Sequence, residues 1–263
     1  MEQKGEEKAY TQAHSTGKYE KASGLTGKYD NVRRFKKKSL ERIRILDLGC
    51  GSADGYDLLM NVTTKDPGIF DYTTSAITQD MLQEYVGIDI NPDLLQQAEE
   101  YIGHLPKTRF IQADLSNGLT PEITKNPPFD IYFTSYGTFS HFHDYQSVKI
   151  IADIAKHAPE RAIFMGDWLG RYTCEWQDLW HHPVDKEYFM DYRISYIYPD
   201  EEERDQMEIS SFPLRLITKD EIMRIIDQAS KESGVTIEPI KFFDRSIFIG
   251  RHMDTGDYNV NCP

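Results

Sequence analysis

Residues 45–55 read ILDLGCGSADG, an apolar stretch that ends in an acid and continues into a turn of small residues. The apolar part predicts a buried strand, and the residues from 52 to 61 predict a helix. Glycine at positions 49 and 51 allows the backbone to turn sharply, and it allows a ligand to approach main-chain amides with no side chain in the way. The stretch therefore predicts a strand, a ligand-binding turn and a helix in succession.

The chain repeats this alternation of strand and helix. Further strands are expected at 84–90, 109–114, 129–134 and 161–167, and further helices at 92–102, 147–157 and 218–233. Asn91 or Pro92 should open the first of these helices, and a capping box of Thr218 and Glu221 should open the last, which Gly234 ends. Alternating strands and helices predict an α/β fold with a Rossmann-like, doubly wound sheet. Strands at 235–243 and 246–251 predict a C-terminal antiparallel hairpin, which makes the sheet seven-stranded and mostly parallel.

Two segments interrupt the alternation. Residues 62–83 contain the turn Asp66-Pro67-Gly68 and predict a short helix that ends near Gln83. Residues 168–214 contain all three tryptophans and are too long and too aromatic for a plain loop. We therefore expect an N-terminal tail or lid at 1–38 and one domain at 39–263 with these two insertions.

Composition narrows the classes of protein. The chain has 263 residues and a net charge of −13, yet residues 1–44 carry 12 Lys and Arg against 6 Asp and Glu. The basic cluster at 33–38 could contact an anion, although such clusters are more often a solvated helix face, and the acidic remainder argues against a nucleic-acid partner. No run of 18 apolar residues predicts a membrane span. Three cysteines without metal-binding spacing favour a cytoplasmic location.

An acid stands at the end of each of the first three strands, at Asp47, Asp89 and Asp114. With the glycine turn, this arrangement resembles the class I S-adenosylmethionine-dependent methyltransferases. The resemblance implies that Gly49, Gly51 and Asp47 accommodate the amino-acid part of S-adenosyl-L-methionine and that Asp89 binds the ribose diol. It also implies that the adenine lies between Ile90 and the Asp114-Leu115 pair. A terminal hairpin is the usual end of this fold.

The same resemblance places further residues near the cofactor. In this class the segment before the first strand often covers the cofactor, which implicates Tyr29 and Arg34; packing of Tyr29 on the edge of the core is the alternative. Thr134 and Tyr136 lie in the loop that faces cofactor and acceptor together. Two features depart from the family pattern: Ala53 replaces the third glycine, and the insertion separates Asp89 from Gly51 by 38 residues.

A dinucleotide-dependent dehydrogenase is the main rival for the glycine turn. That class prefers a complete Gly-x-Gly-x-x-Gly, whereas position 54 is Asp54. The acids in strand order therefore favour S-adenosylmethionine.

The loop after the fourth expected strand bears on the methyl acceptor. It lacks the Asn-Pro-Pro-Tyr tetrapeptide of methyltransferases that act on nucleobase or glutamine amide nitrogens, and it is similar to the loop of small-molecule methyltransferases. His141 could serve as a general base, or it could cap or pack the helix that follows. Asp167, which ends the fifth expected strand, is the predicted acceptor-orienting acid.

The aromatic insertion predicts an acceptor wall. Its candidates are Trp168, Tyr172, Trp176, Trp180 and His181. These rings could enclose an aromatic or cationic acceptor, or they could form the core of a small added subdomain. A metal site of His141, His143 and the 181–182 histidine pair is disfavoured because no carboxylate stands at matched spacing, so we expect no metal.

The sequence thus predicts an enzyme that transfers a methyl group to an oxygen or nitrogen of a small metabolite and releases S-adenosyl-L-homocysteine. Two alternatives stay open. One is a nucleic-acid or protein methyltransferase that uses the basic N-terminal segment, and the other is a non-catalytic protein that binds S-adenosylmethionine. A homodimer is compatible with each of these hypotheses.

Overall fold

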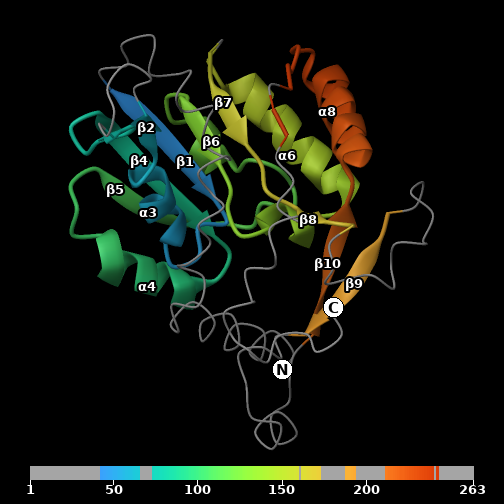
Figure 1. Ribbon diagram of the computed structural model, residues 1–263, viewed down its shortest axis with the longest axis horizontal. Helices are drawn as coiled ribbons and strands as arrows, with labels where there is room; N and C mark the ends of the chain where they lie inside the picture. Colours follow the sequence, from blue (N-terminus) through green and yellow to red (C-terminus); the bar gives the residue numbers. More distant parts are fainter. Residues whose placement is uncertain are drawn as a thin grey trace, which may run out of the picture.

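The computed structural model describes residues 42–65, 73–159, 161–172, 187–193, 211–239 and 241–242. Its centre is a five-stranded sheet in the order β5-β4-β1-β6-β7, and every neighbouring pair of strands is parallel (Figure 1). The strands are β1 (Ile43–Leu48), β4 (Leu82–Asp89), β5 (Thr108–Gln112), β6 (Ile131–Phe133) and β7 (Ile163–Met165). The predicted α/β fold with a mostly parallel sheet is confirmed for these five strands.

Helices cover both faces of this sheet. Along β1 the side chains alternate: Ile43 and Ile45 enter one apolar cluster, and Leu46 and Leu48 enter another. The first cluster includes residues of α3 and α4, and the second includes residues of α6 and α8, which pack side by side (Figure 1). The helices are α3 (Asp54–Met60), α4 (Pro92–Ile102), α5 (Pro121–Thr124), α6 (Asp144–His157) and α8 (Lys219–Ser233), with a 3-10 turn η2 (Thr138–His141) before α6. The strand alternation therefore builds a three-layer core.

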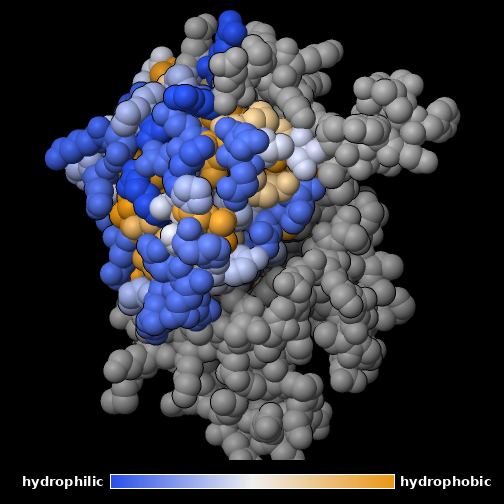
Figure 2. Space-filling view, turned by 90° about the vertical axis from the view of Figure 1, so that its left-hand side faces the viewer, coloured by the Kyte–Doolittle hydropathy of each residue, from blue (hydrophilic) through white to orange (hydrophobic). Residues whose placement is uncertain are grey.

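The surface near the β5 edge of the sheet is mostly hydrophilic. Figure 2 views the molecule from this side and shows small apolar areas between polar side chains.

Helix boundaries follow local signals. Asn91 Oδ1 accepts hydrogen bonds from the amides of Asp93 and Leu94, which opens α4 as predicted. Thr218 and Glu221 form the predicted capping box: the Glu221 amide donates to Thr218 Oγ1, and the Thr218 amide donates to Glu221 Oε2. The left-handed Gly234 ends α8, also as predicted.

The first insertion differs from its prediction. The expected short helix ending near Gln83 is wrong, because β4 already begins at Leu82. Instead, β2 (Thr63–Lys65) and β3 (Thr73–Ser75) pair antiparallel, consistent with the preference of β-branched threonines for strands. The predicted turn at 66–68 lies outside the described residues.

The second insertion contributes a small sheet. Strand β10 (Ser211–Ile217) pairs parallel with β8 (Leu169–Gly170) and antiparallel with β9 (Phe189–Arg193). Strand β10 continues past the predicted end of the insertion at residue 214. Continuous pairing with β8 through Ile217 accounts for this difference.

The predicted hairpin at the end of the chain is not confirmed. Residues 235–239 form no strand, so the first part of the expected 235–243 strand is wrong. The rest of this strand, apart from 241–242, and all of the 246–251 strand lie outside the described residues, as does the segment 1–38. No helix within the described ranges combines the length and apolarity needed to cross a membrane.

Candidate active site

The carboxyl ends of β1 and β6 meet where the strand order reverses. Connections from β1 lead to β4 on one side, and β6 lies on the other, which creates the crevice where open α/β sheets bind ligands. The turn after β1 and the loop after β6 touch there: Thr138 Oγ1, which donates to the Ser135 carbonyl at 2.8 Å, also lies 3.4 Å from the Gly49 carbonyl oxygen. A Cβ atom on Gly49 would lie only 2.4 Å from Thr138 Cγ2. Glycine at position 49 thus permits this close approach.

Three residues of the turn after β1 adopt the left-handed backbone conformation, which is strained only for Ala53. Gly49, Gly51 and Ala53 have positive φ angles of 68°, 54° and 70°. Ala53 stands where the family pattern has glycine, and it adopts the left-handed conformation at a cost of about 1–2 kcal/mol. Left-handed backbone at a ligand-binding turn is typical of a functional site. Ala53 therefore has the left-handed conformation that a glycine could adopt at this position without strain.

Asp89 ties this turn to α4. Its Oδ2 accepts from the Gly51 amide at 2.9 Å, and its Oδ1 accepts from the Asn91 amide at 2.9 Å. Each carboxylate oxygen can accept a second hydrogen bond, so these contacts are compatible with the predicted binding of a diol. The neighbouring Ile90 is 59% exposed, as a side chain that covers a ligand ring needs to be.

Asp47 lies buried below the turn. The Tyr85 hydroxyl donates to Asp47 Oδ2 at 2.6 Å, and the first turn of α3 packs against the same carboxylate at Gly55.

Nearby, Cys50 is buried, and burial together with the charges of Asp47 and Asp89 raises the pKa of its thiol well above the usual range. The thiol is therefore an inert packing group rather than a nucleophile.

The predicted adenine pair separates into two environments. Asp114 is exposed, and its Oδ1 accepts from the Ser116 amide at 2.8 Å. Leu115 is buried in the apolar cluster beneath α6 and α8. The carboxylate thus faces solvent at the end of β5, whereas the leucine side chain belongs to the core.

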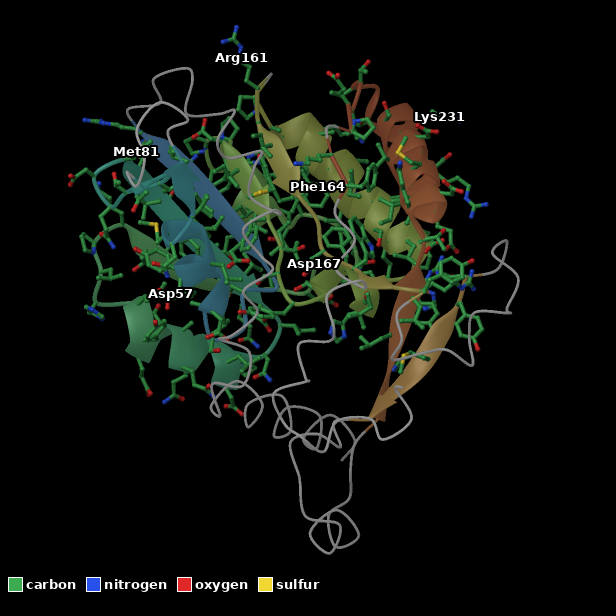
Figure 3. The ribbon with its side chains drawn as sticks, viewed as in Figure 1. Asp57, Met81, Arg161, Phe164, Asp167 and Lys231 are labelled. Carbon is green, nitrogen blue, oxygen red and sulfur yellow. The ribbon has the colours of Figure 1, made fainter. Side chains whose placement is uncertain are left out.

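The loop after β6 is fastened to the end of β7 by Asp167, which Figure 3 labels near the centre of the molecule. Asp167 Oδ2 accepts from the Gly137 amide at 3.2 Å, and the Asp167 amide donates to the buried Thr134 hydroxyl at 2.9 Å. Tyr136, between them, has a positive φ of 55°. Asp167 thus holds this loop in shape, a role that the sequence did not suggest.

The two histidines of the loop have different surroundings. His141 ends η2 and is exposed, yet the surrounding protein desolvates its imidazole and lowers the pKa from 6.5 to about 4. His143 precedes α6, lies 3.2 Å from Glu187 Oε2 through its Nδ1, and packs against Phe189 with ring centroids 4.6 Å apart. His143 therefore has a packing role.

The aromatic candidates are only partly described. Trp168 packs its ring against Phe139, with centroids 4.8 Å apart, and also covers Gly166. Tyr172 is half exposed. These contacts hold the Trp168 ring against the core beside the loop that bears His141. The remaining candidates, Trp176, Trp180 and His181, lie outside the described residues together with Tyr29 and Arg34.

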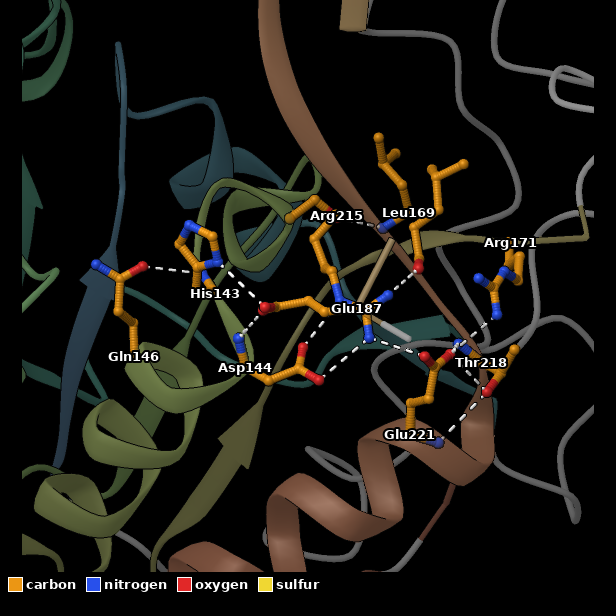
Figure 4. A network of polar contacts seen from close by, with 11 residues as sticks. His143, Asp144, Gln146, Leu169, Arg171, Glu187, Arg215, Thr218 and Glu221 are labelled. Atoms are coloured by element: carbon orange, nitrogen blue, oxygen red, sulfur yellow. Dashed lines mark hydrogen bonds and ion pairs between the residues drawn. The ribbon is translucent and has the colours of Figure 1, made fainter. Parts of the chain in front are cut away.

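A buried ionic network joins the small sheet to the main core, as Figure 4 shows. Arg215 of β10 is fully buried and donates to both carboxylate oxygens of Asp144 and to Glu221 Oε1. Glu187 accepts from the Asp144 amide at the start of α6, and Arg171 lies 4.0 Å from Glu221. The network fixes the start of α6, which follows directly after the loop that bears His141.

Neither Tyr85 nor the Arg215 network was among the predicted site residues. The sequence contains a signal for the Arg215 network, because a cation inside the apolar stretch 212–217 is expected to be buried and to need acidic partners. Tyr85 also had one: it pairs with Ile45 in the register, so it shares a sheet face with Asp47. Within the described part of the chain, no group of three or more His, Cys, Asp or Glu side chains could hold a metal ion.

Comparisons with known proteins agree with this fold. A family described as "Methyltransferase domain" matches residues 71–159. A search of the curated proteins found no significant match. Among solved structures, an S-adenosylmethionine-dependent methyltransferase from Clostridium acetobutylicum aligns with 16% identity and a TM-score of 0.51, over 87% of this chain and 93% of that one.

Two further solved structures are similar at 12% identity and a TM-score of 0.47. The sugar N-methyltransferase KedS8 from Streptoalloteichus sp. aligns over 83% of both chains. The amino pentose methyltransferase CalS10 from Micromonospora echinaspora, solved with S-adenosylmethionine bound, aligns over 83% of this chain and 87% of that one.

Proposed function

We infer that this chain, an S-adenosylmethionine-dependent methyltransferase of the class I fold, transfers the methyl group to a nitrogen or oxygen of a small metabolite. One observation carries the proposal: the glycine turn after β1 and the loop bearing His141 lie in contact at the switch point of the sheet. A cofactor bound to the turn would therefore meet an acceptor bound beside the loop. The matched domain supports the cofactor, and the loop supports the acceptor class.

The residues of the turn suit this cofactor. Its sulfonium and ammonium groups are cationic, and the acids Asp47 and Asp89 lie below and beside the turn. Glycine at 49 and 51 leaves main-chain atoms accessible, as a cofactor in contact with the turn requires. A dinucleotide would instead place its anionic pyrophosphate at this turn, beside the Asp47 carboxylate.

Each of the described site residues would bind a different part of the cofactor. Asp89 would bind the ribose diol through its carboxylate at the end of β4, and the exposed Ile90 would cover the adenine. Asp47 would attract the ammonium group, and Asp114 would accept from the adenine amine. The bound cofactor supplies an electrophilic methyl group. Orientation of the acceptor and exclusion of water are then the main tasks of the protein.

The loop after β6 would handle the acceptor. His141 would accept a proton from a hydroxyl or ammonium group of the acceptor. Its lowered pKa of about 4 keeps the imidazole neutral at physiological pH, although it also makes the imidazole a weaker base than an ordinary histidine. Asp167 would keep the loop in place through Gly137 and Thr134. We propose that the rings of the 168–214 insertion complete the acceptor wall and that the segment 1–38 covers the cofactor.

Methyl transfer from tritiated S-adenosylmethionine tests the proposal. The full-length chain is offered pools of small amines, small hydroxyl compounds, transfer RNA, DNA and protein, and the release of S-adenosylhomocysteine is measured. Turnover with a small-molecule pool supports the proposal. Label transferred only to nucleic acid or protein, or cofactor binding without turnover on any pool, would contradict it.

Calorimetry with S-adenosylhomocysteine and NADH tests the cofactor separately. Asp89→Asn should weaken binding of S-adenosylhomocysteine, whereas Asp93→Asn serves as a matched control. Asp93 is exposed in the first turn of α4, four residues from Asp89. Equal affinities for both variants would remove Asp89 from the binding site, and tighter binding of NADH than of S-adenosylhomocysteine would contradict the cofactor.

A further inference from the structure

A buried tyrosine contacts the acid of the glycine turn. The Tyr85 hydroxyl lies 2.6 Å from Asp47 Oδ2, and both residues are 0% exposed. The two side chains come from neighbouring parallel strands: Tyr85 pairs with Ile45, two residues before Asp47. The contact therefore follows from the register of the two central strands rather than from a flexible loop.

Packing fixes both partners. The Tyr85 ring makes edge contacts with Tyr56 of α3 and Phe110 of β5, with ring centroids 5.2 and 6.3 Å away. On the other side of the carboxylate, a Cβ atom at Gly55 would lie 2.6 Å from Asp47 Oδ2. Neither the phenol nor the carboxylate can move without disturbing the core, so the hydrogen bond sets the direction of the Asp47 side chain.

We propose that Tyr85 is a positioning residue for cofactor binding: its hydroxyl keeps the buried Asp47 carboxylate ionised and oriented toward the ammonium group of S-adenosylmethionine. The inference rests on the proposed function, because it requires that this cofactor binds at the turn. Burial alone favours the neutral form of a carboxyl group, and a hydrogen bond donated to the charged form opposes that effect. An ionised Asp47 then attracts the cationic end of the cofactor.

The surrounding groups allow the phenol to donate over a wide pH range. Burial raises the pKa of Tyr85 well above 10, and the charge of Asp47 and the nearby Cys50 and Tyr56 act in the same direction. Tyr85 therefore keeps its proton. The titratable groups that face Asp47 from the elements around it are Tyr85 on β4 and Cys50 in the turn. Tyr56 on α3 faces Tyr85, and Asp89 faces Cys50. Of these, the Tyr85 hydroxyl is the donor to the carboxylate.

Calorimetric titration of the full-length chain with S-adenosylhomocysteine, from about pH 5 to about pH 8.5, tests the proposal. Tyr85→Phe removes the donor and keeps the ring, so the pKa of Asp47 should rise. The ratio of the variant Kd to the parental Kd should then be lowest at the alkaline end, where Asp47 is ionised in both chains, and should increase toward the acidic end by up to about tenfold for each unit by which the pKa rises. A ratio that stays constant with pH, or equals one throughout, would overturn the proposal.

Two controls sharpen the test. Tyr56→Phe removes the hydroxyl of the neighbouring tyrosine. That hydroxyl accepts a hydrogen bond from the Gln79 side chain rather than donating to Asp47. This variant should therefore leave the pH dependence of Kd unchanged. Methylthioadenosine lacks the amino-acid part of the cofactor, so its affinity should not respond to Tyr85→Phe. An equal loss of affinity for methylthioadenosine would refute a role through the ammonium group.

A second variant, Asp47→Asn, tests the proposal if Tyr85→Phe does not fold. Asp47→Asn keeps the shape and removes the charge, and it should weaken binding of S-adenosylhomocysteine at every pH. Parental affinity in this variant would also refute the proposal. Failure of the parent chain itself to bind S-adenosylhomocysteine would instead refute the proposed function.

Discussion

Replacing Gly49 by alanine tests whether the two loops of the site are packed against each other as described. The new Cβ would lie 2.4 Å from Thr138 Cγ2 and 3.0 Å from Thr138 Oγ1, and residue 49 would keep a φ of 68°. The left-handed backbone costs an alanine about 1 kcal/mol, and overpacking costs about 1–3 kcal/mol more. We expect Gly49→Ala to lower the free energy of unfolding by about 2–4 kcal/mol.

The structure also predicts how to rescue this variant. Thr138→Ser removes the clashing methyl group and keeps the hydroxyl, which donates to the Ser135 carbonyl at 2.8 Å. The double variant should therefore lose only about 1–2 kcal/mol, mostly from the left-handed backbone that the alanine must adopt at position 49. Urea unfolding of the parent, both single variants and the double variant measures the coupling directly. If the double variant loses as much as the two single variants together, the close approach of the loops is refuted.

Further variants address the cofactor, the base and the ionic network. Asp89→Asn should weaken S-adenosylhomocysteine binding by about 1.5–3 kcal/mol in calorimetry, and unchanged affinity would remove its role at the ribose. His141→Ala should lower the rate about 10²–10⁴-fold if His141 is the base, and an unchanged pH–rate profile would leave it a packing residue. Because the folded pKa of His141 is about 4 and its ordinary value is 6.5, the unfolded chain binds the proton first, so stability should fall as the pH drops from 6.5 toward 4. His141→Asn should weaken that dependence in thermal melts, and an identical pH dependence would argue against the lowered pKa. Arg215→Met removes the cation that Glu221 and Asp144 share, and it leaves the buried Glu221 without this partner. The free energy of unfolding in urea should therefore fall by about 3–5 kcal/mol. A loss below about 1 kcal/mol would mean that the network is solvated.

The parts of the fold that the sequence predicted carry local signals. The glycine turn, the Asn91 cap of α4 and the capping box of α8 each depend on residues within a few positions of one another. Such signals act before any tertiary contact forms, so they can be recognised in a single sequence.

The parts that escaped prediction depend on contacts between distant residues. Strands β2 and β3 pair across the segment 66–72, and the expected helix before Gln83 gives way to a longer β4. The Tyr85 contact to Asp47 joins residues 38 positions apart, and the Arg215 contact to Asp144 joins residues 71 apart. Only the register of the strands brings these groups together. Burial of Leu115 likewise depends on how α6 and α8 pack.

The ionic network has a practical consequence for changing the acceptor range of the enzyme. Its anchors Arg171, Glu187 and Arg215 stand at the margins of the segments 173–186 and 194–210, which contain Trp176, Trp180 and His181. A randomised library restricted to those two segments would leave every anchor intact. Variants drawn from it would keep the contacts of the network, so a change of acceptor preference among them would show that these two segments wall the acceptor, as proposed.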